Sequence, residues 1–172
     1  MNISIRPWRI EDAPALSHAL SNPAILCRLR DGIPYPYTEN DARAYISQML
    51  SAGKNSTFAY AIVLDGTAVG SIAAFRQDNI HCRTAELGYY LAQEHWGKGI
   101  MTAAVSDICK AVFAETNIVR IFAMPFASNF GSRRVLEKAG FQFEGIMKYN
   151  AFKDGSLLDT ALYALTRREK EI

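Results

Sequence analysis

The sequence has no apolar run long enough to span a membrane as a helix. Such a helix needs about 18 consecutive, predominantly apolar residues, whereas the longest uncharged apolar run, residues 58–64, has the length of a strand. The amino-terminal residues 1–9 lack the apolar core of a secretion signal. We therefore expect a cytoplasmic chain without a membrane partner.

Cysteine is scarce, and charge of one sign does not dominate. Cys27, Cys82 and Cys109 follow no metal or redox spacing, so we expect reduced thiols, with a disulfide or a catalytic thiol as the alternative. No cluster has metal-ligand spacing, which predicts no metal. Nineteen Lys and Arg residues against seventeen Asp and Glu residues give a formal net charge of +2. So weak a balance argues against an obligate nucleic-acid binder and predicts no DNA partner.

The composition is that of an ordinary soluble globular protein. Hydrophobic residues make up 49% and charged residues 21% of the chain, which excludes general disorder and collagen-like repeats. A chain of 172 residues can bury roughly 70% of its unfolded surface and is too short for two ordinary domains. We expect one domain over residues 1–172.

Local patterns predict strands and helices in a definite order. Thr38 and Asp41 have the spacing of a capping box before an apolar helix face that residues 53–55 end. Asp65-Gly66 is a two-residue hairpin signal, and Ser128 is a candidate cap for a short helix. The predicted strands are residues 3–7, 57–64, 67–75, 84–91, 119–126, 141–148 and 157–165, and the predicted helices are residues 13–22, 39–52, 100–115 and 129–139. The order β-α-α-β-β-β-α-β-α-β-β indicates one α/β (α+β) domain with a mixed sheet.

The segment that carries chemistry joins the strand at 84–91 to the helix that begins at Ile100. Gly97 and Gly99 let the backbone adopt positive φ and approach a ligand closely. The first turn of a helix leaves about four N–H groups unpaired, and Lys98 adds a cation, so the turn is typical of a diphosphate cradle. It matches neither the Walker motif nor the dinucleotide fingerprint. The alternative is a plain strand-to-helix turn.

Three separated motifs resemble those of the GNAT superfamily of N-acetyltransferases, in particular the branch that acetylates the amino-terminal alanine or serine of ribosomal proteins. The motifs are Trp96-Gly97-Lys98-Gly99-Ile100-Met101-Thr102, Ala85-Glu86-Leu87-Gly88-Tyr89, and the segment from Asn129 to Phe141. Ile5-Arg6-Pro7-Trp8 with Glu11-Asp12 extends the match, which covers nearly the whole chain. The resemblance implies a mixed, mostly antiparallel sheet of about seven strands with about four flanking helices.

The resemblance also implies that acetyl-coenzyme A is the cosubstrate and binds where the fourth and fifth strands separate. The pantetheine arm would pair with the backbone of Tyr89, Tyr90 and Leu91. The diphosphate would lie against the loop formed by Trp96, Gly97, Lys98, Gly99, Ile100 and Met101. Asn129 matches an asparagine that contacts the coenzyme near its thioester, although it could also be an ordinary first-turn helix residue.

The implied reaction is direct attack of a primary amine on the thioester. Glu86 is the candidate general base, acting through a water; the alternative is a strand carboxylate that holds a loop. The tyrosine with which many family members protonate the thiolate is replaced by Leu136. Ser132, one turn earlier, could serve as the acid that protonates the thiolate. The alternative is a helix residue without a catalytic role.

The acceptor is left open by the sequence. Tyr35, Tyr37 and Tyr149 are candidates to line its groove, with rim packing as the alternative, and the acceptor would be a protein amino terminus or a small-molecule amine. Arg133, Arg134 and Lys138 are candidate contacts of the adenosine 3′-phosphate. Two other functions stay open: a coenzyme A thioester-binding protein without turnover, and an RNA-associated factor. Because many relatives pair through edge strands, a homodimer is a further hypothesis.

Overall fold

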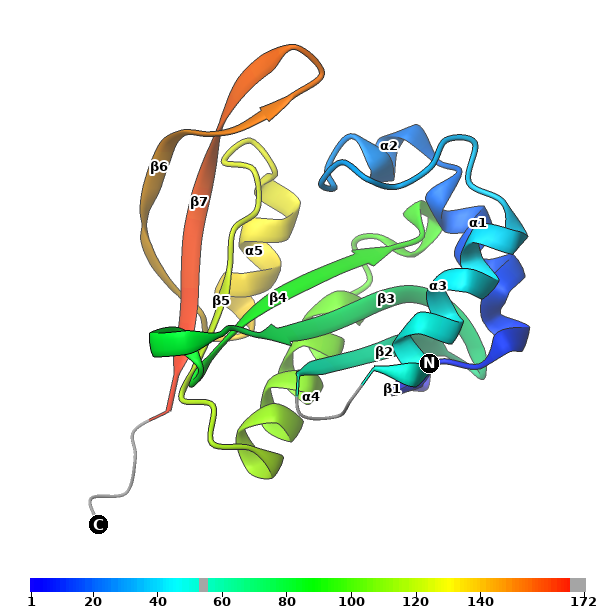
Figure 1. Ribbon diagram of the computed structural model, residues 1–172, viewed down its shortest axis with the longest axis horizontal. Coiled ribbons are helices and arrows are strands. Elements are labelled where there is room, and N and C mark those ends of the chain that lie inside the picture. Colours follow the sequence, from blue (N-terminus) through cyan, green and yellow to red (C-terminus); the bar gives the residue numbers. More distant parts are fainter. Residues whose placement is uncertain (53–55, 168–172) are drawn as a thin grey trace.

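The computed structural model describes residues 1–52 and 56–167, and the end of the second predicted helix at residues 53–55 lies outside them. Seven strands form one sheet in the order β1-β2-β3-β4-β5-β7-β6 (Figure 1). They are β1 (Ile3–Pro7), β2 (Thr57–Leu64), β3 (Thr67–Arg76), β4 (Thr84–Leu91), β5 (Arg120–Ala123), β6 (Gln142–Lys153) and β7 (Ser156–Thr166). Only the β4–β5 pair is parallel. The mixed, mostly antiparallel sheet is confirmed, and so is the element order apart from one additional short helix after the first.

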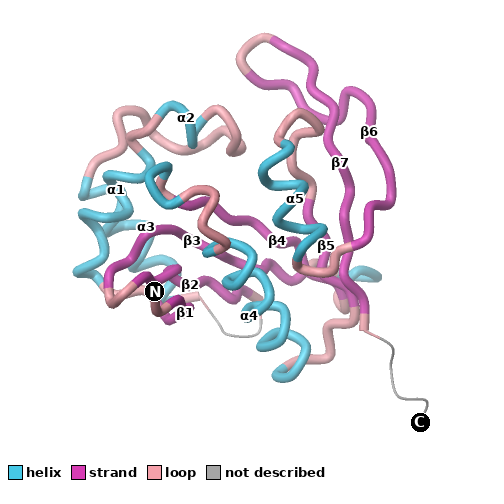
Figure 2. Tube along the Cα trace, turned by 180° about the vertical axis from the view of Figure 1, so that it is seen from behind, coloured by secondary structure: helices cyan, strands magenta, loops and turns pink. Residues whose placement is uncertain are grey.

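Helices cover both faces of this sheet. The α-helices of the described residues are α1 (Ala13–Leu20), α2 (Pro23–Leu26), α3 (Glu39–Ser51), α4 (Ile100–Glu115) and α5 (Phe130–Lys138). The first three share one apolar core with β2 and β3, and the last two share another with β3, β4, β5 and β7. In Figure 1 α3 lies in front of the sheet, and in the reverse view of Figure 2 α4 does. Within the described residues, no helix has both the length and the apolarity needed to cross a bilayer.

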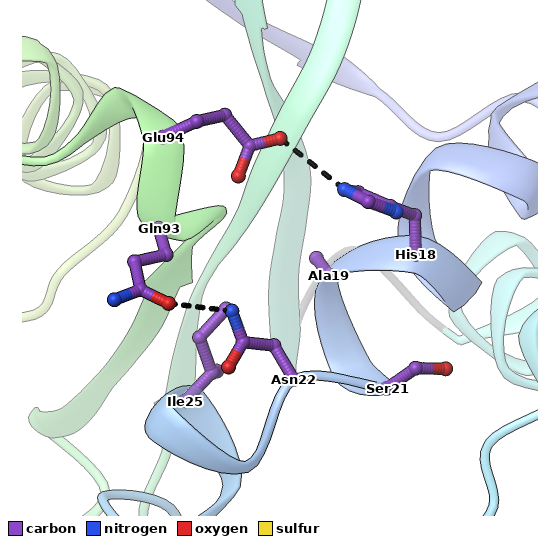
Figure 3. A pocket seen from close by; sticks show the side chains of 7 residues that line it. All are labelled: His18, Ala19, Ser21, Asn22, Ile25, Gln93 and Glu94. Atoms are coloured by element: carbon purple, nitrogen blue, oxygen red, sulfur yellow. Dashed lines mark hydrogen bonds and ion pairs between the residues drawn. The ribbon is translucent and has the colours of Figure 1, made fainter.

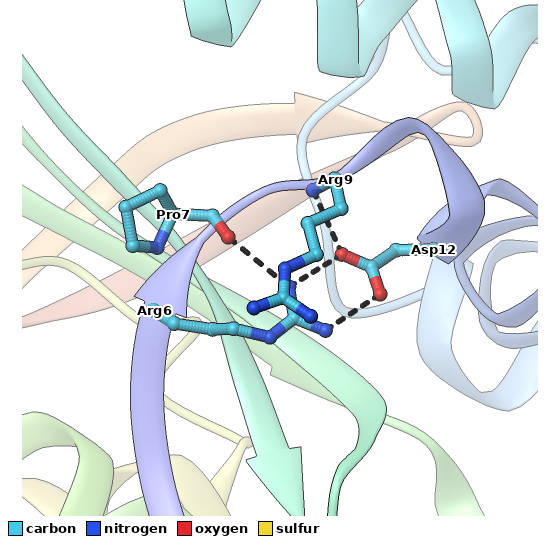
Figure 4. Close-up of polar contacts among 4 residues, drawn as sticks. All are labelled: Arg6, Pro7, Arg9 and Asp12. Atoms are coloured by element: carbon cyan, nitrogen blue, oxygen red, sulfur yellow. Dashed lines mark hydrogen bonds and ion pairs between the residues drawn. The ribbon is translucent and has the colours of Figure 1, made fainter.

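The corner from β1 to α1 is fixed by an ion pair (Figure 4). Arg6 donates two hydrogen bonds to Asp12, at 2.7 and 2.8 Å, and the N–H of Arg9 donates a third at 2.9 Å. Burial alone would raise the pKa of Asp12, but the hydrogen bonds from Arg6 and Arg9 hold it below the ordinary value. The charged form of Asp12 therefore stabilises the fold.

Three helix starts differ in how well the sequence signals them. Thr38 and Asp41 form the expected capping box at α3, with Asp41 N–H donating to Thr38 at 3.2 Å. The prediction that Ser128 caps α5 is wrong, because Asn129 is the N-cap and accepts from Ser132 N–H at 3.2 Å. α1 ends at Leu20, close to its predicted end at residue 22. α2 follows directly and was not predicted; Asn22 is its N-cap.

Two tight turns close the long hairpins. Asp65 and Gly66 both have positive φ, as the predicted two-residue turn between β2 and β3 requires. Asp154 and Gly155 do the same between β6 and β7. β6 extends five residues beyond its predicted end at residue 148, to Lys153. Its register shifts between Met147 and Ala151, so the strand bends before it continues to the hairpin tip.

Candidate active site

The sheet opens at the parallel pair β4–β5. β4 pairs with β5 only over residues 84–86, whereas β4 itself continues to Leu91. The predicted strand 119–126 is shorter than expected: β5 ends at Ala123, two residues before Pro125, which has no N–H for a ladder. Residues 87–91 of β4 consequently have a strand partner, β3, on one side only.

The unpaired side of β4 presents main-chain hydrogen-bonding groups. Ala92 N–H donates to Val69 at 2.8 Å, and the carbonyl of Thr84 accepts from Gln77 at 3.0 Å, so even-numbered positions face β3. Since main-chain groups alternate in direction along a strand, the odd-numbered positions 87, 89 and 91 face the opening. One of their carbonyls, that of Leu91, accepts from the Trp96 indole at 2.8 Å.

Alternation also gives β4 two chemically different faces. Leu87 and Leu91 belong to the core under α4 and α5, and Tyr89 packs against that core. Tyr90 packs against the core of α1–α3, as the cross-strand neighbour of the buried Ser71. Glu86 has the same parity as Tyr90 and therefore lies on the α1–α3 face.

The loop after β4 is built to expose N–H groups. Gly97 and Gly99 have φ of 75° and 78°, and a Cβ added at either position would meet nothing within 4 Å. Gly99 is the N-cap of α4, and no side chain caps this helix start. The first intrahelical bond runs from Ala103 N–H to the carbonyl of Gly99 at 3.1 Å. The N–H groups of residues 100–102 are thus available to a ligand, next to the positive end of the helix dipole.

The remaining loop side chains anchor the loop. Lys98 donates to the carbonyl of Glu94 at 2.9 Å, and the guanidinium of Arg28 lies 5.1 Å from the Trp96 ring centroid. A cavity of about 210 Å³ lies where α1 and α2 meet the turn before the loop, and Figure 3 shows the side chains that line it. There Asn22 donates to Gln93 at 2.7 Å, and His18 lies 3.3 Å from Glu94. These contacts tie the loop to the α1–α2 face.

A cleft of about 1620 Å³ runs across the opening in the sheet. Typical small-molecule pockets measure roughly 300–1,000 Å³, so this cleft has room for two substrates together. Of the predicted site residues, those that line it are Tyr37, Glu86, Tyr89, Tyr90, Leu91, Trp96, Gly97, Gly99, Ile100, Met101, Asn129 and Ser132. Lys98 is not among the lining residues.

The Glu86 side chain is held by Arg30, a residue that no sequence motif marks. Its carboxylate forms an ion pair with Arg30, whose side chain is 72% exposed while that of Glu86 is 18% exposed. The neighbouring Asp31 pairs with Lys153 at the β6–β7 hairpin at 2.7 Å. The segment 28–34 therefore contacts both the candidate base and the hairpin, and it forms one wall of the cleft. No local motif marks Arg30, because its partner is 56 residues away in the sequence.

α5 contributes the other side of the site. The Tyr89 hydroxyl donates to the Ser132 carbonyl at 3.3 Å, and it lies 2.8 Å from the Ser132 hydroxyl. Leu136, one turn later, is fully buried in the core. Burial raises the pKa of Tyr89, although its hydrogen bond with Ser132 opposes this. Tyr89 is therefore a neutral phenol over the physiological range.

Other predicted residues lie elsewhere. Tyr35 and Tyr149 are 68% and 71% exposed and do not line the cleft. Tyr37 does line it and is almost fully buried, and burial raises its pKa to about 12. Arg133 instead donates to the Tyr163 hydroxyl at 3.1 Å and to the Ala127 carbonyl at 3.0 Å, outside the cleft. Arg134 and Lys138 do line the cleft.

His95, which no sequence motif marks, lines the cleft, and its Nδ1 has no hydrogen-bond partner in the described part of the chain. All three cysteines are free thiols, with Cys109 buried. Among residues 1–52 and 56–167, no three His, Cys, Asp or Glu side chains are grouped so as to hold a metal. The lining of the cleft offers main-chain groups, hydroxyls, the carboxylates of Asp31, Asp41 and Glu86, and the imidazole of His95.

Known proteins share this architecture. A Bacillus subtilis protein described as the probable N-acetyltransferase YjcK is 38% identical over 107 residues, covering 62% of this chain and 59% of that protein. The B. subtilis putative ribosomal N-acetyltransferase YdaF is 34% identical over 110 residues, 64% of this chain and 60% of that protein. The matched part thus spans less than two thirds of either relative. Mycobacterium smegmatis RimJ in complex with CoA-disulfide superposes with a TM-score of 0.84 at 26% identity, over 95% of this chain and 81% of that chain.

The family model described as the acetyltransferase (GNAT) domain matches residues 2–142. This range contains β4, the glycine loop, α4 and α5, the elements that build most of the cleft. The chain belongs to the GNAT acetyltransferase family.

Proposed function

We propose that the chain transfers the acetyl group of acetyl-coenzyme A to a primary amine, by direct attack of the amine on the thioester. The observation that carries the proposal is the convergence of three features on one cleft. These are the unpaired edge of β4, the uncapped start of α4, and a carboxylate on the opposite face of β4 from α5.

The cleft fits the two ends of the coenzyme. The free N–H groups at the start of α4 and the open space beside Gly97 and Gly99 suit a diphosphate. The main-chain groups of Tyr89 on the open edge of β4 suit the amides of a pantetheine arm. Arg134 and Lys138 on α5 line the same cleft and suit a further phosphate.

The reaction divides between the two faces of β4. On the α1–α3 face, Glu86 accepts a proton from the acceptor ammonium, directly or through a water. The amine nitrogen then bonds to the thioester carbon, and a main-chain N–H on the open edge of β4 stabilises the oxyanion. Collapse breaks the carbon–sulfur bond, and the sulfur leaves toward α5 with the bonding electron pair. The second proton of the nitrogen passes through water to the thiolate, so the products are the amide and the free thiol.

We favour the amino terminus of a polypeptide as the acceptor. The cleft continues past Glu86 between the segment 28–34 and the hairpin residues 150–153, so an extended chain can enter alongside its terminal amine. The relative YdaF is described as a putative ribosomal N-acetyltransferase, which agrees with this choice. A small-molecule amine is the alternative acceptor.

A thiol-release assay with acetyl-coenzyme A tests the proposal. The panel contains short peptides with free amino-terminal Ala or Ser, the same peptides with blocked termini, and free polyamines and amino acids. We expect release with free-terminus peptides only. Release with small amines alone would replace the acceptor, and binding of acetyl-coenzyme A with no release from any amine would indicate a non-catalytic binder.

A further inference from the structure

Gly88 lies in the middle of β4, where neither the backbone nor the packing requires a glycine. Its φ lies outside the positive range, and an added Cβ would meet Cε2 of Phe75 at 3.9 Å, an ordinary van der Waals contact. At Gly70 on β3, by contrast, a Cβ would lie 2.4 Å from the Tyr90 carbonyl oxygen. A glycine inside a strand weakens the strand and often marks a place where a ligand comes close. The reason for Gly88 is therefore to be found in the cleft.

The position of Gly88 leaves a depression in the floor of the cleft. Side chains alternate along a strand, so Gly88 shares the α1–α3 face of β4 with Glu86 and Tyr90. The partners of Glu86 and Gly88 on β3 are Phe75 and Ala73. Between larger side chains, the floor thus carries only the hydrogen of Gly88 and the methyl group of Ala73. Gly88 is exposed despite its place in the interior of the sheet, and it lines the cleft.

The lining on this side of the cleft is largely apolar. Leu29, Ile33 and Tyr37 line the cleft and pack against the core of α1–α3. Phe75 also lines the cleft, and its ring is the group that lies nearest to the empty side-chain position of Gly88. Apolar and aromatic walls suit an uncharged, apolar side chain of a ligand.

The geometry of a polypeptide acceptor brings its first side chain to this depression. Two residues along a strand advance about 6.5 Å, so Gly88 is within reach of a side chain whose amine lies at Glu86. In the proposed function, the rest of the polypeptide leaves between the segment 28–34 and the hairpin residues 150–153. A tetrahedral Cα sends the side chain and the main chain in different directions. The first side chain therefore turns away from that exit and lies along β4, over Gly88.

We propose that Gly88 is a specificity-determining residue, whose missing side chain leaves room beside Glu86 for a branched apolar first side chain of the acceptor, such as that of Leu. The proposal rests on the proposed transfer to a polypeptide amino terminus. It extends the range of acceptors beyond the small first residues Ala and Ser. A methyl group added at Gly88 would fill part of the depression and leave Glu86 and the open edge of β4 in place.

Two peptides that differ only in their first residue, Leu or Ala, measure this selectivity by thiol release. In the wild type, kcat/KM for the Leu peptide should at least equal that for the Ala peptide. Gly88→Ala should lower the ratio of the two about tenfold, because an apolar pocket discriminates one carbon by about that factor. Gly88→Val should lower the ratio further. Gly88→Ala should fold as stably as the wild type, since its Cβ makes an ordinary contact.

The ratio within one protein does not depend on the fraction of active molecules. Ser4→Val supplies a control variant, because it adds methyl groups at an exposed position of β1 outside the cleft. Its ratio should equal that of the wild type.

A binding measurement makes the test independent of turnover. The acetylated forms of the two peptides are titrated by calorimetry into the wild type and Gly88→Ala, each saturated with coenzyme A. The wild type should bind the acetyl-Leu peptide more tightly than the acetyl-Ala peptide, and Gly88→Ala should reduce this preference about tenfold.

Three results would overturn the proposal: a Leu-to-Ala ratio unchanged in Gly88→Ala, a wild type that discriminates against Leu tenfold or more, or no binding of either acetylated peptide. A changed choice between acetyl- and propionyl-coenzyme A, with the peptide ratio unchanged, would assign the depression to the acyl group and overturn the proposal as well. Absence of thiol release with every amine, with the binding preference intact, would instead refute the proposed function and support the pocket.

Discussion

Two arginine–carboxylate pairs in this chain share their chemistry and differ in their surroundings. Arg6 and Asp12 join β1 to α1, with side chains 20% and 9% exposed and two parallel hydrogen bonds. Arg30 and Glu86 meet at the wall of the cleft, and the Arg30 side chain is 72% exposed. The first pair is desolvated and bidentate, whereas the second has its cation largely in water.

The difference in exposure indicates that one pair stabilises the fold and the other can open in the cleft. Breaking a desolvated pair leaves an uncompensated charge and is costly, so Asp12 serves the fold. A pair whose cation is mostly hydrated contributes about 0–1 kcal/mol, so Arg30 can be displaced from Glu86 at little cost. An incoming acceptor ammonium carries the same charge as Arg30 and can take its place beside the carboxylate.

The largest expected effect comes from the carboxylate in the cleft. Glu86→Gln removes the proposed proton acceptor but keeps the size of the side chain, so kcat should fall about 100-fold or more. Thermal stability and the Kd for acetyl-coenzyme A should stay close to wild type. Thiol release together with calorimetry gives both numbers, and an unchanged rate would remove Glu86 from the role of base.

Removing the carboxylate charge of the buried pair should instead lower stability and leave activity unchanged. Asp12→Asn should lower the free energy of unfolding by about 2–3 kcal/mol, somewhat less than for a fully buried pair because Arg6 keeps some exposure. The activity per folded molecule should be unchanged. Urea unfolding followed by circular dichroism measures the first quantity, and a wild-type midpoint would show that the pair does not support the fold.

Acidification separates the same variant from the wild type. The pKa of Asp12 in the folded protein lies below its ordinary value of about 3.9. Its stabilising contribution is therefore complete above about pH 4 and is lost as the pH falls through the folded-state pKa. Between about pH 4 and pH 2, the wild type should lose more stability than Asp12→Asn. Parallel curves for the two proteins would contradict this assignment.

A smaller effect is expected at the glycine loop. Gly99→Val places a β-branched residue at a φ of 78° and projects a side chain into the open space of the cleft. The Kd for acetyl-coenzyme A should rise about tenfold, or about 1.4 kcal/mol. Gly66→Val has comparable strain, at a φ of 90°, in the β2–β3 turn outside the cleft. It should lower stability without changing this Kd.

The smallest effect should follow from removing the displaceable cation. Arg30→Ala should lower the KM for the amine about threefold, because the acceptor no longer competes with a guanidinium, and leave the KM for acetyl-coenzyme A alone. Arg43→Ala breaks a similar exposed pair with Glu39 outside the cleft and serves as control. A higher KM for the amine in Arg30→Ala would show that Arg30 assists binding instead.

The sequence predicts local features of this molecule better than distant ones. The Thr38 capping box and the Asp65-Gly66 turn depend on neighbouring residues, and both form as expected. Two other local features were missed: β5 ends at Ala123, two residues before Pro125, and α2 begins at an N-cap, Asn22, that follows directly on the end of α1. The Arg30–Glu86 and Tyr89–Ser132 contacts join residues 56 and 43 positions apart, so only the folded chain reveals them.

Titration of acetyl-coenzyme A into the folded wild-type protein, followed by calorimetry, tests the central claim most directly. The claim is that main-chain groups on the open edge of β4 and at the start of α4 bind the cosubstrate. We predict saturable binding at one site per chain, weakened about tenfold in Gly99→Val. Absence of binding heat at several temperatures, from protein with native circular dichroism, would contradict the account.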